Sequence, residues 1–90
     1  MKLRIESFHW LEWVVEKIVE KHGVTPEEVE EAFFHPPYKV RRTASDKYQL
    51  FGRANDGRYL FVVFAWVEHS VKVITARDMT DAERRYFQHK

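Results

Sequence analysis

The chain has 90 residues, of which 44% are hydrophobic, 16% aromatic and 32% charged, with only 3 glycines and 3 prolines, so one folded domain over residues 1–90 is expected and a disordered or low-complexity chain is excluded. The absence of cysteine excludes disulfides and fits a cytoplasmic location, and the longest apolar run, Leu60 to Val67, is too short to cross a membrane. The net charge of +1 conceals a split, because residues 1–37 carry 4 Lys/Arg against 8 Asp/Glu and residues 38–90 carry 11 against 6. The basic second half is compatible with an anionic partner and equally with an ordinary solvated surface.

The first half of the sequence predicts a short strand followed by two helices. After a strand around Leu3 to Phe8, a helix is expected from about Trp10 to His22, because apolar residues recur there with a helical period and charged residues take the other face. Gly23 is expected as the left-handed residue that ends this helix. A second helix should begin with the capping sequence Thr25-Pro26-Glu27-Glu28 and stop before Pro36-Pro37.

From Tyr38 the hydrophobic period changes to two, which is typical of strands. Four strand patterns follow, at Tyr38 to Arg41, Tyr48 to Arg53, Tyr59 to Trp66 and Val71 to Arg77. The third pattern is apolar on both faces and should form a central strand. Asn55-Asp56-Gly57 predicts a hairpin turn, Glu68-His69-Ser70 a second one, and Thr80-Asp81-Ala82-Glu83 caps a helix to about Gln88. The predicted fold is α+β, with two N-terminal helices and a short C-terminal helix packed on a mostly antiparallel sheet of four to five strands.

The residue types favour one kind of chemistry over others. The five histidines lack the close spacing of zinc ligands, and no glycine-rich phosphate loop or serine elbow is present, so neither a metal nor a cofactor is expected. Arg, Lys, His, Tyr and Glu around the predicted sheet are the residue types that a metal-free ribonuclease needs, namely a proton acceptor, a cation for the phosphorane and a proton donor. A solvated surface or a protein interface is the structural alternative.

Three segments follow one another in a specific order and spacing. They are His22-Gly23-Val24-Thr25-Pro26-Glu27-Glu28 after a helix that opens with Trp10, then Gly52 to Arg58, and then Ile74 to Tyr86. Together, from about Phe8 to Tyr86, they resemble the BrnT family of bacterial toxins. The resemblance implies a RelE-like fold, mRNA cleavage without a metal, and a BrnA-type antitoxin that binds DNA through a ribbon-helix-helix module. DNA would then be contacted only through the antitoxin, and no membrane is involved.

The resemblance, together with the local charge, designates site residues. The expected catalytic residues are Arg77, Arg53, Glu83, His22 and Tyr86. The residues expected to bind RNA are Arg58, Lys21, Arg84 and Arg85, joined by Arg41 and Arg42 because they lie in a positively charged segment that also contains Lys47.

Several of these residues have a structural alternative. Arg77 could bridge Asp78 or Asp81, and Glu83 already occupies the third position of a capping box. His22 could cap its helix, where the helix dipole favours a cation. Arg53 and Arg58 could be solvated charges of a hairpin, Tyr86 could pack on the sheet, and the three tryptophans are most simply core or interface anchors.

The first helix departs from the family pattern. Leu11 stands where members of the family commonly have Asp, and Val14 and Ile18 stand where they often have Lys and Asn. If those polar residues act in RNA binding or catalysis, the chain would be a weakened toxin or a relative that only binds protein or RNA.

Overall fold

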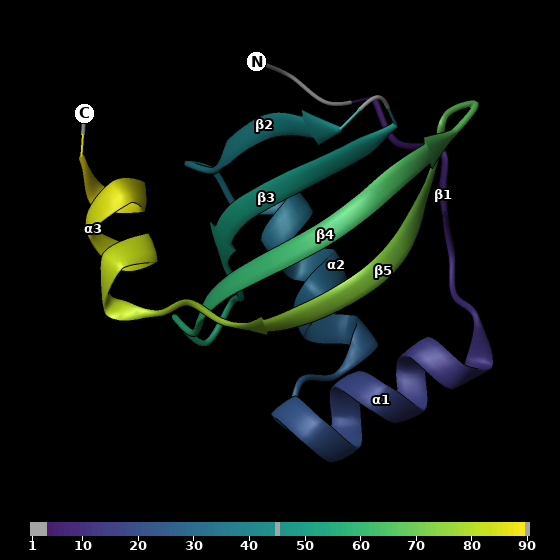
Figure 1. Cartoon of the computed structure of the whole chain (residues 1–90), viewed down its shortest axis with the longest axis horizontal. Coiled ribbons are helices and arrows are strands. Elements are labelled where there is room, and N and C mark those ends of the chain that lie inside the picture. The colour runs from purple at the N-terminus through teal and green to yellow at the C-terminus, as the bar shows by residue number, and fades with distance from the viewer. Residues whose placement is uncertain (1–3, 45, 90) are drawn as a thin grey trace.

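The protein, examined as a computed structural model that describes residues 4–44 and 46–89, is built on one sheet. Its elements follow in the order β1 (Ser7–His9), α1 (Glu12–His22), α2 (Pro26–Phe34), β2 (Lys39–Ala44), β3 (Lys47–Arg53), β4 (Tyr59–Val67), β5 (Ser70–Asp78) and α3 (Asp81–Gln88). The strands lie in the order β1-β5-β4-β3-β2, with β1 parallel to β5 and all other pairs antiparallel (Figure 1). The α+β class and the mostly antiparallel sheet are therefore confirmed.

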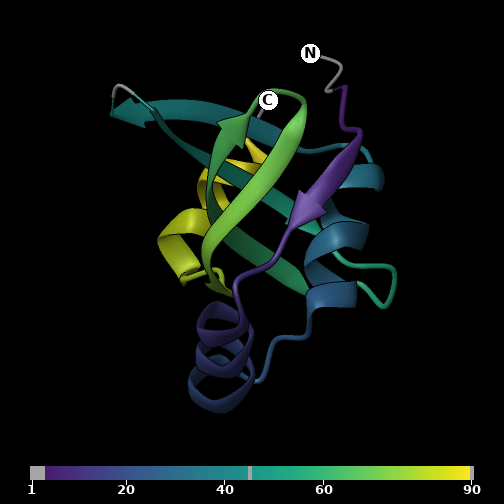
Figure 2. The same cartoon turned by 90° about the vertical axis from the view of Figure 1, so that its right-hand side faces the viewer.

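The helices divide between the two faces of the sheet. Figure 2 shows α2 on one side of the strands and α3 on the other, with α1 below the sheet. We call the side that carries α1 and α2 the inner face and the side that carries α3 the outer face. As the sequence predicts, β4 is the central strand, and its side chains are buried toward both faces.

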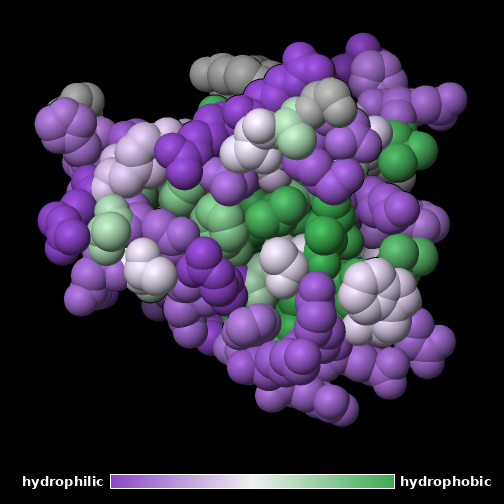
Figure 3. All heavy atoms as spheres, viewed as in Figure 1, coloured by the Kyte–Doolittle hydropathy of each residue, from purple (hydrophilic) through white to green (hydrophobic). Residues whose placement is uncertain are grey.

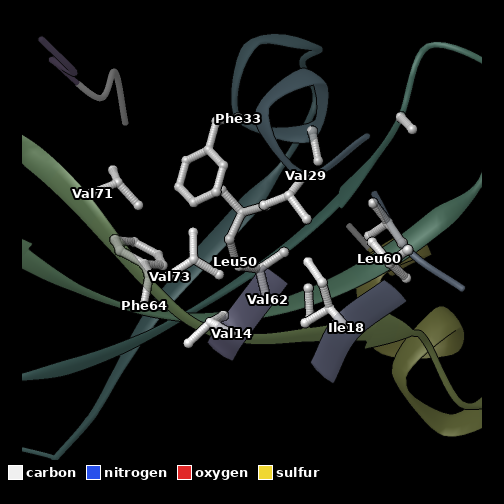
Figure 4. Close-up of a cluster of buried hydrophobic side chains, with 14 residues drawn as sticks. Val14, Ile18, Val29, Phe33, Leu50, Leu60, Val62, Phe64, Val71 and Val73 are labelled. Carbon is white, nitrogen blue, oxygen red and sulfur yellow. The ribbon is translucent and has the colours of Figure 1, made fainter. Parts of the chain in front are cut away.

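The main core fills the space between the inner face and the first two helices. Val14 and Ile18 from α1 and Val29 and Phe33 from α2 meet the inner-face side chains of the strands, and the other labelled members of the cluster are Leu50, Leu60, Val62, Phe64, Val71 and Val73 (Figure 4). The rings of Phe33 and Phe64 meet edge to face with 5.1 Å between their centroids. Burial of these apolar residues is the chief force that fixes α1 and α2 against the sheet.

Two predicted boundaries near the N-terminus are wrong. The helix α1 begins at Glu12 rather than at Trp10, because Leu11 is an extended N-cap residue with φ −79° and ψ 135°. Trp10 instead packs against the main core and donates its indole N–H to Glu30 of α2 at 2.8 Å. The strand β1 covers only Ser7–His9, and Leu3, where the strand was expected to begin, lies outside the described residues.

The predicted helix signals are otherwise confirmed. Gly23 ends α1 in the left-handed region at φ 63°, where a side chain would be strained. Thr25 and Glu28 form a reciprocal capping box at the start of α2, and Thr80 and Glu83 form a second one at the start of α3. The hairpin between β3 and β4 turns through Gly57 at φ 93°.

Arg58, directly after that hairpin, joins three elements. Its guanidinium donates to the carbonyl oxygens of His22 at 3.0 Å and Gly23 at 2.7 Å, at the end of α1. It also donates to Glu28 of α2 at 3.2 Å and to both carboxylate oxygens of Asp78, at 2.6 and 3.0 Å, where β5 ends. Cations at a helix C-terminus and forked contacts with carboxylates are both stabilising arrangements. Arg58 therefore fixes the turn between α1 and α2 to the edge of the sheet.

Replacing Arg58 tests this structural role. We expect Arg58→Met to lower the free energy of unfolding by about 1–3 kcal/mol, because two helix-end carbonyls and two carboxylates lose a charged donor. In a domain of this size such a loss lowers Tm by roughly 4–8 °C per kcal/mol. Urea unfolding measures the change, with Arg85→Met on the exposed side of α3 as the matched control. Equal stability of the two variants would contradict a clamping role for Arg58.

Candidate functional site

The outer face carries a row of basic and aromatic side chains that crosses four strands. Lys39 of β2 is paired with Phe51 of β3, Phe51 with Phe61 of β4, and Phe61 with Arg77 of β5. Phe51 and Phe61 are buried against each other with 5.2 Å between centroids, and the Arg77 guanidinium lies 4.3 Å from the Phe61 ring. The row therefore places a cation at each end of an aromatic pair.

A second cluster lies beside this row, at the hairpin end of the sheet. Tyr59 of β4 is paired with Arg53 of β3, whose guanidinium lies 4.9 Å from the tyrosine ring. From α3, Arg84 lies 4.2 Å from the same ring and Phe87 meets it edge to face. Gln88 donates a hydrogen bond to the Tyr59 hydroxyl at 3.3 Å.

Charged groups attach α3 to the outer face at both of its ends. At its start, Arg77 donates to the two carboxylate oxygens of Glu83 at 2.8 and 2.9 Å. At its end, Lys39 donates to the backbone carbonyls of Tyr86 and His89. None of the side chains of α3 is fully buried, so these polar contacts and the aromatic ring contacts hold the helix in place.

Tyr86 lies in the middle of these contacts. Its ring packs on Phe51 with 4.8 Å between centroids, and the cations of Lys39 and Arg41 lie 4.6 and 4.8 Å from it. The residue nevertheless remains 37% exposed. It can thus pack on the sheet and still present part of its side chain to a ligand.

The electrostatics of the outer face follow from these contacts. The hydrogen bonds from Arg77 hold the pKa of Glu83 below its usual value, and Glu83 raises the pKa of Arg77. In the described part of the chain, Glu83 is the carboxylate that forms an ion pair with a cation of the outer face, namely Arg77. The other cations of this face are Lys39, Arg41, Arg53 and Arg84. The face therefore carries excess positive charge around its apolar middle, and Figure 3 shows hydrophobic residues there bordered by hydrophilic ones.

The structure brings together about half of the predicted site residues. Some of them lie on the outer face itself and the others on α3, in contact with that face: they are Arg41, Arg53, Arg77, Glu83, Arg84 and Tyr86. Lys21 and His22 lie at the end of α1, on the other side of the sheet, and Arg58 is occupied there by protein acceptors. Arg85 is an exposed residue of α3. Arg42 is paired with Tyr48 and therefore points to the opposite side of β2 from Arg41.

Two features of the site differ from the sequence interpretation. Arg77 does not bridge the carboxylate of Asp78 or Asp81, because its guanidinium is paired with Glu83 in the first turn of α3. Tyr59 and Lys39 were not singled out at all. Strand alternation could have placed Lys39 beside Arg41, and the hairpin at Asn55-Asp56-Gly57 could have paired Tyr59 with Arg53.

Other features of the surface lie apart from this face. One pocket lies on α2, near the hairpin between β3 and β4, and is lined by Glu27, Glu30, Glu31, Phe34 and Asn55. Another lies at the β1 edge, lined by Ser7, Phe8, His9, Val67, Ser70 and Lys72. Within residues 4–44 and 46–89, no group of three or more histidine and acidic residues could hold a metal ion, and no helix is long and apolar enough to cross a membrane.

Comparison with known proteins identifies the family. Residues 10–83 match the model for the ribonuclease toxin BrnT of type II toxin–antitoxin systems. The chain belongs to the BrnT family. A crystal structure of the Brucella abortus ribonuclease toxin BrnT is similar to this BrnT-family chain, with a TM-score of 0.72 and 25% sequence identity over 83% of this chain and 97% of the other. A search of curated protein sequences gave no match.

The positions where this BrnT-family chain departs from the expected pattern are structural. Val14 and Ile18 are fully buried in the main core, and Leu11 packs against it. All three lie on the inner side of the sheet, where α1 packs. Their apolar character therefore removes no polar group from the outer face.

The ion pair between Arg77 and Glu83 should appear in the pH dependence of stability. A carboxylate whose pKa is lowered in the folded state stabilises the protein above its unfolded pKa, near 4.5, and this contribution is lost as the pH falls through the lowered value. We expect Glu83→Gln, which can still cap α3, to destabilise the protein by about 0.5–1 kcal/mol at neutral pH, after allowance for solvent screening of the partly exposed Arg77. The difference from wild type should shrink in acid.

Urea unfolding of both proteins at neutral and acidic pH measures this difference. Asp81→Asn is the matched control, because it removes a carboxylate from the same first turn of α3 and leaves the pair of Arg77 and Glu83 in place. A difference between wild type and Glu83→Gln that persists undiminished below the lowered pKa would contradict the assignment.

Proposed function

We propose that this single-domain BrnT-family toxin is a metal-independent endoribonuclease that cleaves mRNA on the outer face of its sheet. It acts in the cytoplasm and is neutralised by a BrnA-like ribbon-helix-helix antitoxin. The antitoxin binds DNA, and the toxin is linked to DNA only through it. The observation that carries the proposal is the row of Lys39, Phe51, Phe61 and Arg77 across the outer face, with α3 beside it. The cations of this row, together with the partly exposed Tyr86 beside it, suit an unpaired RNA strand, whose phosphates and bases need these two kinds of partner.

The guanidiniums of this face can provide the charge stabilisation that phosphoryl transfer needs. Glu83 accepts from both terminal nitrogens of Arg77 and the Asp78 carbonyl from one of them, which holds the guanidinium in a fixed orientation. Of its five N–H donors, the Nε–H and one terminal N–H then remain for an anion within the described part of the chain. A donor oriented before the reaction stabilises the developing charge of a phosphorane without having to reorganise. In this proposal Arg77 contacts the scissile phosphate, and Glu83 is a positioning residue for it.

The remaining cations and rings bind the rest of the strand. Arg41, Arg53 and Arg84 contact neighbouring phosphates, while the exposed part of Tyr86 contacts a base. Lys21, His22 and Arg58 are left out of this site because they lie at the end of α1. An inactive binding module is less well supported, since the apolar departures at Val14 and Ile18 are in the main core.

Expression in a bacterium tests the activity. We expect induced wild type to arrest growth and to cleave an oligoribonucleotide in the presence of EDTA, and to spare an analogue that lacks the 2′-hydroxyl at the scissile position. Arg77→Ala should lose about 10²-fold or more in cleavage rate, because a preorganised charged donor is removed. Arg77→Lys, which keeps a charge without the fork, should fall between the two.

Arg4→Ala is the control for this experiment, since Arg4 is an exposed residue before β1, with a side chain 80% exposed. Thermal melts establish that each variant is folded. Cleavage that stops when EDTA is added would contradict metal independence, and full activity of folded Arg77→Ala would contradict the site.

Two adjacent arginines on β2 test which face of the sheet binds RNA. Arg41 lies on the outer face and Arg42 on the opposite side, so the two substitutions change the same charge at nearly the same place. We expect Arg41→Gln to weaken RNA binding several-fold and to reduce by about 1 the slope of log affinity against log salt, as the loss of one phosphate contact does. Arg42→Gln should change neither quantity. Equal effects of the two substitutions would contradict binding on the outer face.

A further inference from the structure

The cleavage proposed above needs a group that accepts the proton of the attacking 2′-hydroxyl. On the outer face the obvious candidate is the carboxylate of Glu83, but both of its oxygens accept hydrogen bonds from Arg77, and one also accepts from the backbone N–H of Thr80. A carboxylate held in this way is a weak proton acceptor at neutral pH. The acceptor must therefore be another group within reach of the Arg77 phosphate site.

Tyr59 has the surroundings that such a group requires. It lies two residues before Phe61 on β4 and shares the outer face with it, so it is a neighbour of the Arg77 row. The groups that face its ring are the guanidinium of Arg53 from β3 and, from α3, the guanidinium of Arg84 and the ring of Phe87. Its hydroxyl accepts a hydrogen bond from Gln88 at 3.3 Å.

We propose that Tyr59 is the catalytic residue that takes up the 2′-hydroxyl proton during RNA cleavage, an inference that rests on the function proposed above. The Tyr59 phenolate accepts the proton from O2′ as O2′ forms its bond to phosphorus and the bond from phosphorus to O5′ breaks. The leaving O5′ takes a proton from solvent water, and Tyr59 returns its proton to solvent. The products are a 2′,3′-cyclic phosphate and a 5′-hydroxyl, and no oxidant, metal or further reactant is consumed.

The charges around Tyr59 favour the form that this step needs. The hydrogen bond from Gln88 and the guanidinium of Arg84 lower the pKa of the Tyr59 phenol below 10, its ordinary value, and the charge of Arg53 acts in the same direction. The same two arginines can hold the phosphates on either side of the scissile bond. This would place the 2′-hydroxyl next to the phenol.

The test compares Tyr59→Phe with Tyr48→Phe. The first substitution keeps the ring for Arg53, Arg84 and Phe87 and removes only the hydroxyl, while the second makes the same change on the inner face, where Tyr48 stacks on Phe64. Steady-state cleavage of a short oligoribonucleotide is measured from about pH 6 to about pH 10, and the ultraviolet absorbance of tyrosinate is titrated over the same range. Thermal melts verify that both variants are folded.

We expect Tyr59→Phe to lower kcat by about 10²-fold or more with KM unchanged, and to abolish the rise of kcat with pH that wild type shows. The tyrosine that titrates first in wild type should be missing from the titration of Tyr59→Phe and present in that of Tyr48→Phe. If wild type cleaves RNA and Tyr59→Phe cleaves it equally well with the same pH profile, Tyr59 is not the proton acceptor and the proposed function stands. If wild type cleaves no RNA, both proposals fall together.

Discussion

The strand β4 imposes the constraint on which the rest of the structure depends. Leu60, Val62 and Phe64 face the inner side and Phe61 faces the outer side, and all four are buried. A strand that is apolar on both faces must be covered on both to exclude water. The helices α1 and α2 cover the inner face with a continuous apolar core. On the outer face, where Phe51 and Phe61 are also buried, the short α3 lies only at one end of the sheet (Figures 1 and 2). In the described part of the chain, the remainder of that face has no helix over it.

The way in which α3 is attached decides the chemistry of this open face. If α3 packed on the sheet through apolar side chains alone, as α1 and α2 do on the inner face, the outer face would be buried in a second hydrophobic core. Here the carboxylate of Glu83 at the start of α3 binds Arg77, and the backbone carbonyls at its end accept hydrogen bonds from Lys39. Contacts between aromatic rings of the helix and of the sheet complete the attachment. The cations are therefore oriented but incompletely neutralised, which is the condition under which guanidiniums bind an anion strongly. In the proposed function, the groups that stabilise α3 are thus also the groups that contact RNA.

The sequence predicted the features that depend on neighbours along the chain. Both capping boxes, the left-handed Gly23 and the turn at Asn55-Asp56-Gly57 involve residues within a few positions of one another, so their signals are local. Arg58 was predicted to bind RNA, or else to be a solvated hairpin charge. Its clamping role was not predicted, because its partners come from three elements that only the tertiary fold brings together. For the same reason, the sequence did not predict a role for Tyr59, whose place in the alternating pattern is that of an ordinary strand residue. Its meeting with Arg84 and Gln88 requires α3 to fold back across the hairpin end of the sheet.

The fold also converts the division of charge in the sequence into a division in space. The acidic first half forms the helices behind the inner face, where Glu27, Glu30 and Glu31 line a pocket on α2. The basic second half forms the strands and α3 around the outer face. A polyanion approaching the molecule is therefore repelled from one side and attracted to the other, and this asymmetry orients it before any contact forms. Because the net charge is only +1, such steering acts through the arrangement of the charges rather than through their sum. The near-neutral composition, uninformative by itself, is thus compatible with an RNA-binding face.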